Sequence, residues 1–283
     1  MSISVQTRAD QAGPSKENLC LICGKISRSR FNKRFGEMEV GYLECTTCHH
    51  LSATFFESES IYHNGAYFGE IDAGWEARNL RILQFIQFLA VLPGVVVSRG
   101  SPILDYGSGR GKLVEDLVRK GFNAIGFEPY PNSTVDSAHV LCDRRALSLL
   151  PQRPDLVTCI EVLEHIRQPD QTLREILDLM SANGYLLIST GIYESGAHDA
   201  TWYYLNPVAG HVSIYTECSL LSLMARNDFY PVARLDDSIW LFRRRLGHKR
   251  TFMEAIYYAL SQLRVKCKVK LFANSWLWKF FHE

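Results

Sequence analysis

The stretch Ile103-Leu104-Asp105-Tyr106-Gly107-Ser108-Gly109-Arg110-Gly111-Lys112 decides how this chain is predicted to fold. Apolar residues lead into an acidic residue, glycines follow at alternate positions, and a helix-like segment begins at Lys112. Glycine tolerates positive φ and lets a ligand approach the backbone, so this order is typical of a strand, a tight turn and a helix N-terminus. The amides of such a turn and the helix dipole favour a polar or negatively charged group. The same turn also occurs at ordinary strand–helix junctions, so other parts of the chain must decide whether it binds a ligand.

Strand and helix signals alternate from this stretch onward. Strands are predicted at 103–106, 123–127, 138–142, 155–160 and 185–190, with helices at 112–120 and 170–180. This alternation requires crossover connections, which favour a mostly parallel sheet covered by helices on both faces. A helix at 216–227 and strands at 230–235 and 238–244 follow, and the two strands predict an antiparallel hairpin. The predicted fold class is α/β, with a seven-stranded, mostly parallel sheet and a closing antiparallel hairpin.

Two segments precede the first of these strands. Residues 75–92 place apolar side chains at amphipathic-helix spacing, and Pro93-Gly94 ends that helix. Residues 51–74 are rich in aromatic side chains without a clean period. They either pack against the next domain or form a lid over a substrate, with Tyr62 and Tyr67 as the lid candidates. Residues 53–95 are therefore predicted to be a helical and aromatic linker and lid.

Four cysteines form two close pairs near the N-terminus. Cys20 and Cys23 are separated by 21 residues from Cys45 and Cys48, and glycines in the intervening segment predict short hairpins. Each pair can present two sulfurs from one turn, and four thiolates complete a tetrahedral zinc shell. The alternatives are two surface turns without metal, a redox pair, or a site in which His49 or His50 replaces a cysteine. We predict a small zinc-binding domain, a zinc knuckle, at residues 18–52.

Composition and charge restrict the class of protein. The chain has 283 residues, 47% of them hydrophobic and 22% charged, with a net charge of +1, so no global attraction to nucleic acid or to a membrane is expected. Residues 1–17 are polar, are predicted to be disordered and lack the apolar core of a secretion signal. No apolar run reaches the roughly 18 residues of a membrane span. Cysteine pairs without a secretion signal favour a reducing, cytoplasmic setting.

The C-terminal tail, residues 247–283, is basic and aromatic. From Arg243 to Glu283 the chain has ten Lys or Arg and two Glu, a local excess of eight that leaves minus seven for the rest. The tail is either an extra helical layer with a solvated basic face or a surface that docks on a membrane or another anionic partner. No feature of the sequence indicates an oligomeric state.

Two acidic positions add chemistry to the glycine turn. Glu128 follows Asp105 by 23 residues and ends the second predicted strand. A carboxylate at that point can accept hydrogen bonds from both ribose hydroxyls of an adenosine ligand, as nicotinamide and adenosylmethionine cofactors require. The segment Glu161-Val-Leu-Glu164-His165 offers two carboxylates and an imidazole. If it turns helically, these three share a face and suit a divalent cation.

Four segments together carry a family resemblance. ILDYGSGRGKL, GFEPY, PDLVTCIEVLEHIRQP and GYLLIST resemble, in this order, the motifs of class I S-adenosylmethionine (SAM)-dependent methyltransferases, which have a Rossmann-like fold. The similarity is closest to the branch with the ubiquinone-biosynthesis O-methyltransferases and related small-molecule and sugar methyltransferases, and covers about residues 101 to 245. A cysteine knuckle before such a core resembles a subset of bacterial tailoring methyltransferases. The resemblance implies a SAM-binding core at residues 96–246.

The resemblance also implies roles for individual residues. The methionine part of the cofactor is expected on Asp105, Gly107, Ser108, Gly109 and Gly111, the ribose on Glu128, and the adenine amine near Asp143. Glu161 ends the fourth strand, where open α/β sheets bind ligands.

The resemblance makes His165 the candidate catalytic residue, together with Glu164 and the later histidine His211. Some relatives use such an ExxEH segment and a later histidine to hold a metal that lowers the pKa of a hydroxyl and orients it. In metal-free relatives the histidine serves as a general base or caps the turn. The possible second divalent cation is therefore placed on Glu161, Glu164, His165 and His211.

The function predicted from the sequence is SAM-dependent methyl transfer to an oxygen of a small molecule or sugar, with His165 as general base or metal ligand. Nucleic acid is not favoured as a partner because of the neutral charge. The alternatives are a metal-dependent RNA 2′-O-methyltransferase and a non-catalytic module with the SAM fold. The aromatic run Trp202-Tyr203-Tyr204 either stacks on the methyl acceptor or covers the core.

Overall fold

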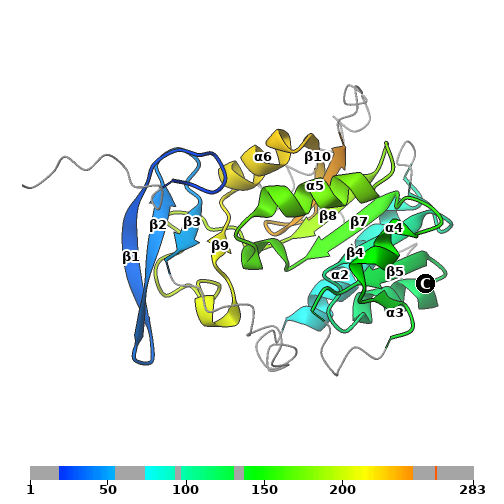
Figure 1. Ribbon diagram of the computed structural model, residues 1–283, viewed down its shortest axis with the longest axis horizontal. Helices are drawn as coiled ribbons and strands as arrows, with labels where there is room; N and C mark the ends of the chain where they lie inside the picture. Colours follow the sequence, from blue (N-terminus) through cyan, green and yellow to red (C-terminus); the bar gives the residue numbers. More distant parts are fainter. Residues whose placement is uncertain (1–18, 55–73, 93–96, 131–136, 245–258, 260–283) are drawn as a thin grey trace, which may run out of the picture.

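Two β-sheets organise the protein (Figure 1). The computed structural model describes residues 19–54, 74–92, 97–130, 137–244 and 259. The predictions for residues 1–17, for Tyr62 and Tyr67, and for the 247–283 tail apart from residue 259 lie outside the described residues. Among the described helices, none has the length and apolar character needed to cross a membrane.

The larger sheet has the strand order β10-β11-β8-β7-β4-β5-β6. Its strands are β4 (Pro102–Tyr106), β5 (Asn123–Phe127), β6 (Val140–Leu141), β7 (Leu156–Ile160), β8 (Tyr185–Ser189), β10 (Phe229–Arg234) and β11 (Ile239–Arg244). The strands from β4 to β8 pair in parallel, and β11 pairs antiparallel with β8 and β10. The predicted seven-stranded, mostly parallel sheet with a closing antiparallel hairpin is confirmed.

Helices cover both faces of the larger sheet. They are α2 (Trp75–Leu89), α3 (Lys112–Arg119), α4 (Arg144–Ser148), α5 (Pro169–Leu179) and α6 (Glu217–Arg226). Along β8, Leu186 and Ile188 pack in one buried cluster with residues of α5 and α6, while Tyr185 and Leu187 pack in another with residues of α2 and α3. Figure 1 shows α5 and α6 lying along the same side of the strands. Burial on both faces explains the continuous apolar runs of the parallel strands.

Some elements differ from those predicted. Helix α2 stops at Leu89 rather than at residue 92, and the third strand is the two-residue β6 rather than 138–142. Helix α4 was not predicted. It begins because the Asp143 side chain accepts a hydrogen bond from the Arg145 amide, as is typical of a helix N-cap.

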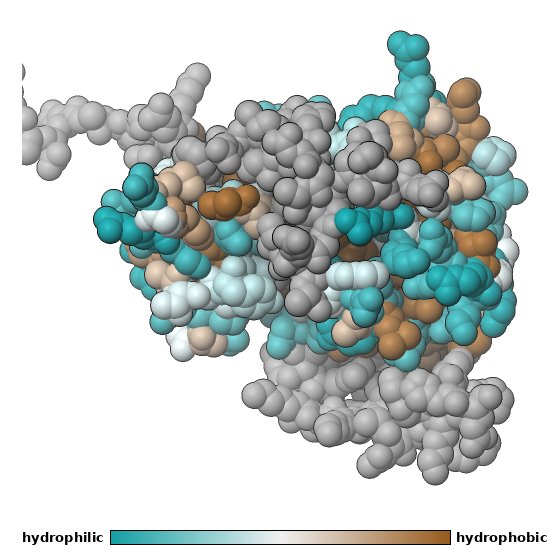
Figure 2. Space-filling model, turned by 90° about the horizontal axis from the view of Figure 1, so that it is seen from below, coloured by the Kyte–Doolittle hydropathy of each residue, from teal (hydrophilic) through white to brown (hydrophobic). Residues whose placement is uncertain are grey.

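The smaller sheet has the order β1-β2-β3-β9. Its strands are β1 (Ser27–Phe35), β2 (Met38–Cys45), β3 (Leu51–Ala53) and β9 (Ser213–Ile214). The segment between the cysteine pairs forms one long hairpin, β1–β2, rather than several short ones. Figure 2 shows mainly hydrophilic residues over this end of the molecule, at the left. Strand β9 comes from the far half of the chain, so the smaller sheet includes residues from well beyond the predicted 18–52 boundary.

The strand order determines where polar side chains gather. The chain runs from β4 through β5 to β6 and then returns to the other side of β4 to form β7. Ligands of open α/β sheets bind at the carboxyl ends of the strands beside such a reversal. Asp105 lies near the carboxyl end of β4, and Glu128 and Glu161 directly follow β5 and β7.

Candidate functional site

The glycine turn after β4 has a backbone that other residues adopt only with strain. Gly107, Gly109 and Gly111 have φ of 77°, 55° and 77°. The Gly109 amide donates to Glu128 Oε2 at 2.8 Å. A Cβ added to Gly107 would lie 2.6 Å from Val162 Cγ2, so the turn packs directly on the segment that follows β7.

Asp105 and Glu128 are buried carboxyl groups at the carboxyl ends of the neighbouring strands β4 and β5. Asp105 accepts a hydrogen bond from Thr158 Oγ1 at 2.6 Å, and Glu128 Oε1 accepts one from the Tyr130 amide at 2.9 Å. Burial raises the pKa of Asp105 to about 6; the Thr158 hydrogen bond opposes this shift and the charge of Glu128 adds to it. Burial also raises the pKa of Glu128, while the Tyr130 and Gly109 amides lower it. Both groups suit a ligand that brings cationic or hydroxyl donors.

The raised pKa of Asp105 predicts a pH-dependent cost to stability. The folded pKa of about 6 exceeds the ordinary value of 3.8, so the folded protein retains a proton that the unfolded chain loses. The contribution of Asp105 to the free energy of unfolding therefore falls as pH rises from about 4 to 6, by about 3 kcal/mol. In the ligand-free protein, the free energy of unfolding of Asp105→Asn should therefore exceed that of the wild type by about 3 kcal/mol above pH 6. Below pH 4 the two proteins should have the same free energy of unfolding.

Denaturant unfolding at several pH values measures this difference. Asp178→Asn, a change at an exposed position of α5, is the control. A stability difference that does not grow between pH 4 and pH 6 would contradict the assignment of the shift to Asp105.

Glu161 adopts a strained backbone at the end of β7. Its φ is 53°, which is uncommon for a residue with a side chain, and residues with such strained backbones cluster at functional sites. The carboxylate Oε1 accepts a hydrogen bond from Ser189 Oγ at 2.6 Å and lies 4.0 Å from Arg78 Nε of α2. Helical structure begins only at Leu163, in the 3₁₀ turn η2 (Leu163–His165). The prediction that Glu161, Glu164 and His165 share a helical face is therefore wrong.

Tyr204 connects the two carboxyl groups of this segment. Its hydroxyl oxygen lies 2.9 Å from Glu161 Oε2 and 2.6 Å from Glu164 Oε1. The phenol has one hydrogen and can donate to only one of them. Burial raises the pKa of fully buried Glu164 well above its usual value, with a further contribution from the charge of Glu161. A proton on Glu164 therefore satisfies the second short contact, and Thr190 Oγ1 donates to Glu164 Oε2 at 3.1 Å.

His165 and His211 face each other beside Glu164. Their ring centroids are 4.8 Å apart in an edge-to-face arrangement. His211 Nδ1 donates to the Tyr204 carbonyl at 2.9 Å, because a carbonyl can only accept, so in the neutral form of the ring Nε2 carries the lone pair. Burial, together with His211, lowers the pKa of His165 well below its usual value, against an opposing contribution from the Gly210 carbonyl. His165 is consequently a neutral imidazole at neutral pH.

Three of the four predicted cation ligands come together. One ligand atom from each of Glu164, His165 and His211 lies within 4.8 Å of the others. Glu161 does not belong to this group, because its backbone turns away from the helical path and its carboxylate contacts Ser189 and Tyr204. The group can hold a proton or suit a small divalent cation.

The aromatic run after β8 has three different environments. Tyr204 is buried in the site. Trp202 stacks on His198, with ring centroids 4.2 Å apart and planes 4° apart, and also lies 5.2 Å from the Tyr204 ring at 30°. Tyr203 is 79% exposed. Trp202 therefore packs among protein rings, and Tyr203 is the member of the run whose ring is open to solvent.

Several site residues were not predicted from the sequence. Four of them are polar side chains that contact the predicted carboxylates: Arg78, Thr158, Ser189 and Thr190. Tyr204 was predicted to stack on the acceptor or to cover the core, and its hydroxyl contacts with Glu161 and Glu164 were not predicted. A usable signal existed for Ser189 and Thr190, since two hydroxyl residues directly follow the apolar run of a strand that ends at the ligand edge. Asp143, predicted near an adenine amine, lies at the N-terminus of α4 with one carboxylate oxygen engaged by the Arg145 amide.

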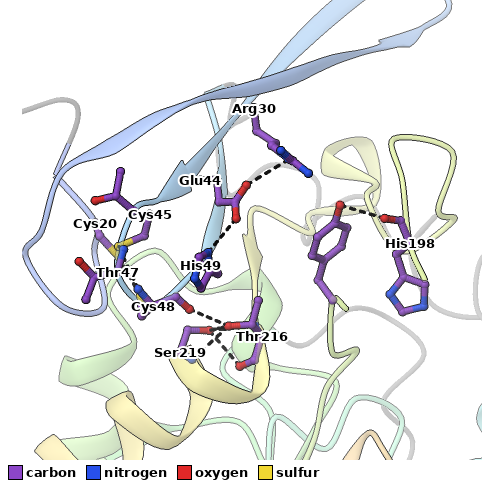
Figure 3. A network of polar contacts seen from close by, with 12 residues as sticks. Cys20, Arg30, Glu44, Cys45, Thr47, Cys48, His49, His198, Thr216 and Ser219 are labelled. Atoms are coloured by element: carbon purple, nitrogen blue, oxygen red, sulfur yellow. Dashed lines mark hydrogen bonds and ion pairs between the residues drawn. The ribbon is translucent and has the colours of Figure 1, made fainter. Parts of the chain in front are cut away.

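The four N-terminal cysteines form a second, separate cluster, drawn in part in Figure 3. Their sulfurs lie within 4.8 Å of one another, with Cys20–Cys48 at 3.6 Å and Cys23–Cys45 at 3.4 Å. These separations exceed the roughly 2.05 Å of a disulfide and approach the roughly 3.8 Å between sulfurs around tetrahedral zinc. The Cys48 contact lowers the pKa of Cys20 to about 5 and raises that of Cys48, so the pair shares one proton that a cation can replace.

The neighbouring histidines do not join the cysteine cluster. His49 Nδ1 lies 3.0 Å from Glu44 Oε1, as Figure 3 shows. His50 is buried against Tyr215, with ring centroids 5.0 Å apart. Among the described residues, the group at this position whose ligand atoms lie close enough to hold a metal ion consists of the four cysteines alone.

Comparison with known proteins identifies the family to which this chain belongs. A family model described as "Methyltransferase domain" matches residues 75–234, more than half of the 283 residues. The chain belongs to this methyltransferase domain family, as the sequence motifs predicted.

Curated relatives match about a third of this chain. A ubiquinone biosynthesis O-methyltransferase from Azorhizobium caulinodans is 34% identical over 103 residues, which are 32% of this chain and 41% of that protein. A mitochondrial ubiquinone biosynthesis O-methyltransferase from Schizosaccharomyces pombe is 32% identical over 107 residues, which are 32% of this chain and 38% of that protein. The chain thus spans about two fifths of the length of these curated relatives.

A solved structure is also similar to this chain. Magnesium protoporphyrin IX methyltransferase from Synechocystis PCC 6803 with bound SAH is 16% identical, with a TM-score of 0.46, and the match covers 65% of this chain and 91% of that one.

Proposed function

We propose that this protein is a SAM-dependent methyltransferase that acts on a hydroxyl oxygen of a small molecule or sugar. One observation carries the proposal: the glycine turn beside Asp105 and Glu128 packs through Gly107 on Val162, inside the segment that presents Glu164 and His165. A cofactor site and a proton-accepting site are therefore neighbours. Membership of the methyltransferase domain family and relatives named as O-methyltransferases support the same reaction.

The residues at the carboxyl ends of β4 and β5 fit the cofactor. Two buried carboxyl groups with raised pKa values suit the ammonium and hydroxyl donors of SAM. Ser108 Oγ is buried and has no hydrogen-bond partner among the described residues. We assign the ribose of SAM to Glu128 and its adenine to Asp143, with Glu161 at the edge of the cofactor site. The methionine part of SAM is assigned to Asp105, Gly107, Ser108, Gly109 and Gly111. When bound, SAM supplies an activated methyl group.

His165 is the proposed general base. Methyl transfer to a hydroxyl needs alignment of the acceptor and removal of its proton. His165 is neutral and has Glu164 Oε1 4.0 Å from its Nε2, and the neutral acid on Glu164 adds no charge that would hold a proton on the ring. His211 is the proposed second acceptor of a proton, because its hydrogen bond to the Tyr204 carbonyl places the lone pair of its neutral form on Nε2. In the second form of this proposal, Glu164, His165 and His211 hold a divalent cation that orients the hydroxyl.

The four cysteines are proposed to hold a structural zinc ion. Their spacing fits a tetrahedral thiolate shell, and backbone amides point at two of the sulfurs: Ile22 at Cys20, and Thr47 and Cys48 at Cys45. Such amide contacts stabilise thiolates. A cytoplasmic location stays a prediction, and one matched relative is named as mitochondrial. The RNA 2′-O-methyltransferase and non-catalytic alternatives gain no support from the family or the relatives, and we do not propose them.

Labelled-methyl transfer tests the proposed function. The purified chain is incubated with labelled SAM and with phenols, nucleotide sugars, glycans or short RNAs, with and without divalent cations. We expect transfer to a phenol or sugar hydroxyl. Calorimetry that detects no binding of SAM or S-adenosylhomocysteine would contradict the proposal. Transfer that survives exhaustive chelation would exclude the form with a second cation.

Gly107→Ala is expected to weaken SAM binding at least about tenfold. The new Cβ would meet Val162 at 2.6 Å in a backbone with positive φ, and such strain costs about 1–3 kcal/mol. Gly36→Ala in the β1–β2 turn is the matched control, because Gly36 also has positive φ but has no atom within 4 Å of the added Cβ. Calorimetric Kd values that are equal for the two variants would exclude a cofactor role for this turn.

A further inference from the structure

Lys33 of β1 connects the smaller sheet to the chain around Tyr204. Its ammonium Nζ donates to the carbonyl oxygens of Trp202 and Leu205, each at 2.9 Å, across 169 and 172 positions of sequence. The ammonium also lies 5.3 Å from the ring centroid of Phe35. Burial lowers the pKa of Lys33, with an opposing contribution from Asp199. A cation that gives up water for two carbonyls makes a directed contact, unlike a solvated surface lysine.

The two carbonyls flank the residue that organises the proposed acceptor site. Tyr204 lies between them in sequence. Its carbonyl fixes the His211 ring, and its hydroxyl contacts both Glu161 and Glu164. A shift of the Tyr204 main chain would therefore displace His211, and it would also break the contacts through which the Tyr204 hydroxyl bridges Glu161 and Glu164.

The smaller sheet also holds the far end of the same segment. The Ala53 amide donates to the Val212 carbonyl at 3.0 Å, and β3 pairs with β9 directly after His211. Thr216 Oγ1 donates to the Cys48 carbonyl at 2.7 Å, as Figure 3 shows. Figure 1 shows the smaller sheet beside the segment that leads into β9. Residues 202–216 are thus held at both ends by the element that carries the cysteine cluster.

We propose that Lys33 is a positioning residue for methyl transfer, because it fixes the main chain of Tyr204. Through this contact, the smaller sheet positions His211 and the Tyr204 hydroxyl that bridges Glu161 and Glu164. The inference rests on the proposed function and assigns the smaller sheet a part in it. Lys33 acts through Tyr204: among the described residues its ammonium contacts the Trp202 and Leu205 carbonyls and the Phe35 ring.

The test compares Lys33→Met with Arg34→Met in the full-length chain. Lys33→Met keeps most of the side-chain length and removes the donors, whereas Arg34→Met removes an exposed charge from the next position of β1. We expect Lys33→Met to lower kcat by about 10- to 100-fold, because small displacements of reacting groups have effects of that size. The calorimetric Kd for SAM should stay unchanged. Nitrogen NMR should show His211 losing its fixed Nδ1–H form in Lys33→Met and keeping it in Arg34→Met.

Equal kcat values and equal His211 spectra for the two variants would overturn the proposal. If the wild-type chain binds no SAM or methylates no acceptor, the proposed function fails, while the His211 spectrum still decides whether Lys33 positions this ring. If Lys33→Met does not fold, Lys33→Gln replaces it, since the amide can still donate to one carbonyl. An intermediate kcat with an altered His211 spectrum is then expected, and wild-type values of both would overturn the proposal.

Discussion

His165→Ala is expected to lower kcat by about 100- to 10,000-fold, the range typical of a lost general base. The side chain is 10% exposed, neutral because burial lowers its pKa, and next to both Glu164 and His211. The calorimetric Kd for SAM should change little, because the proposed cofactor contacts come from the turn after β4 and from Glu128. Initial rates of labelled-methyl transfer and calorimetry measure the two effects separately.

The pH profile adds a check on the same residue. A base whose pKa is lowered stays unprotonated to lower pH, so the acid limb of kcat should lie below the usual histidine pKa of 6.5. His139→Ala, at an exposed position before β6, is the control and should keep wild-type kcat. Unchanged turnover in His165→Ala would remove His165 from the mechanism. If chelation abolishes the activity of the wild-type protein and added divalent metal restores it, the form of the proposal in which Glu164, His165 and His211 hold a cation would be favoured.

Cys45→Ser is expected to abolish stoichiometric zinc binding and to lower the melting temperature by about 10 °C. Structural zinc sites of this type contribute about 10–16 kcal/mol to the folding of small domains, and losing several kcal/mol moves Tm by about 2–4 °C per kcal/mol in a protein of this size. Cys45 is fully buried, and its sulfur also accepts hydrogen bonds from the Thr47 and Cys48 amides.

The consequences should extend beyond the hairpin. Cys20, Cys45 and Cys48 belong to the same buried cluster as residues of β7, β8 and α6, so their loss disturbs the larger domain. Cys218→Ser, which changes an exposed cysteine outside the group, should retain both zinc and Tm. Metal analysis and thermal unfolding provide the measurements. A wild-type chain that contains no zinc and is unaffected by chelators would contradict the proposed zinc site.

Local patterns made much of the fold predictable. The parallel strands appear as apolar runs because both of their faces are buried, and β4, β5, β7 and β8 lie within a residue of their predicted bounds. The strand predicted at 138–142 was too long, because only Val140 and Leu141 pair with β5 there. The carboxylates at the ends of β4, β5 and β7 were also predictable, since the ends of parallel strands meet at one edge of the sheet.

The sequence alone determined the order of the strands and helices, the glycine turn and the two cysteine pairs, because each depends on residues a few positions apart. Tertiary structure decided the rest of the candidate site. Contacts between Tyr204 and Glu164, between Lys33 and Trp202, and between β3 and β9 join residues 40 to about 170 positions apart. Such contacts depend on how whole elements pack, and no local period encodes them. The left-handed backbone of Glu161, which keeps it out of the histidine cluster, is likewise set by its packed surroundings and not by its neighbours in sequence.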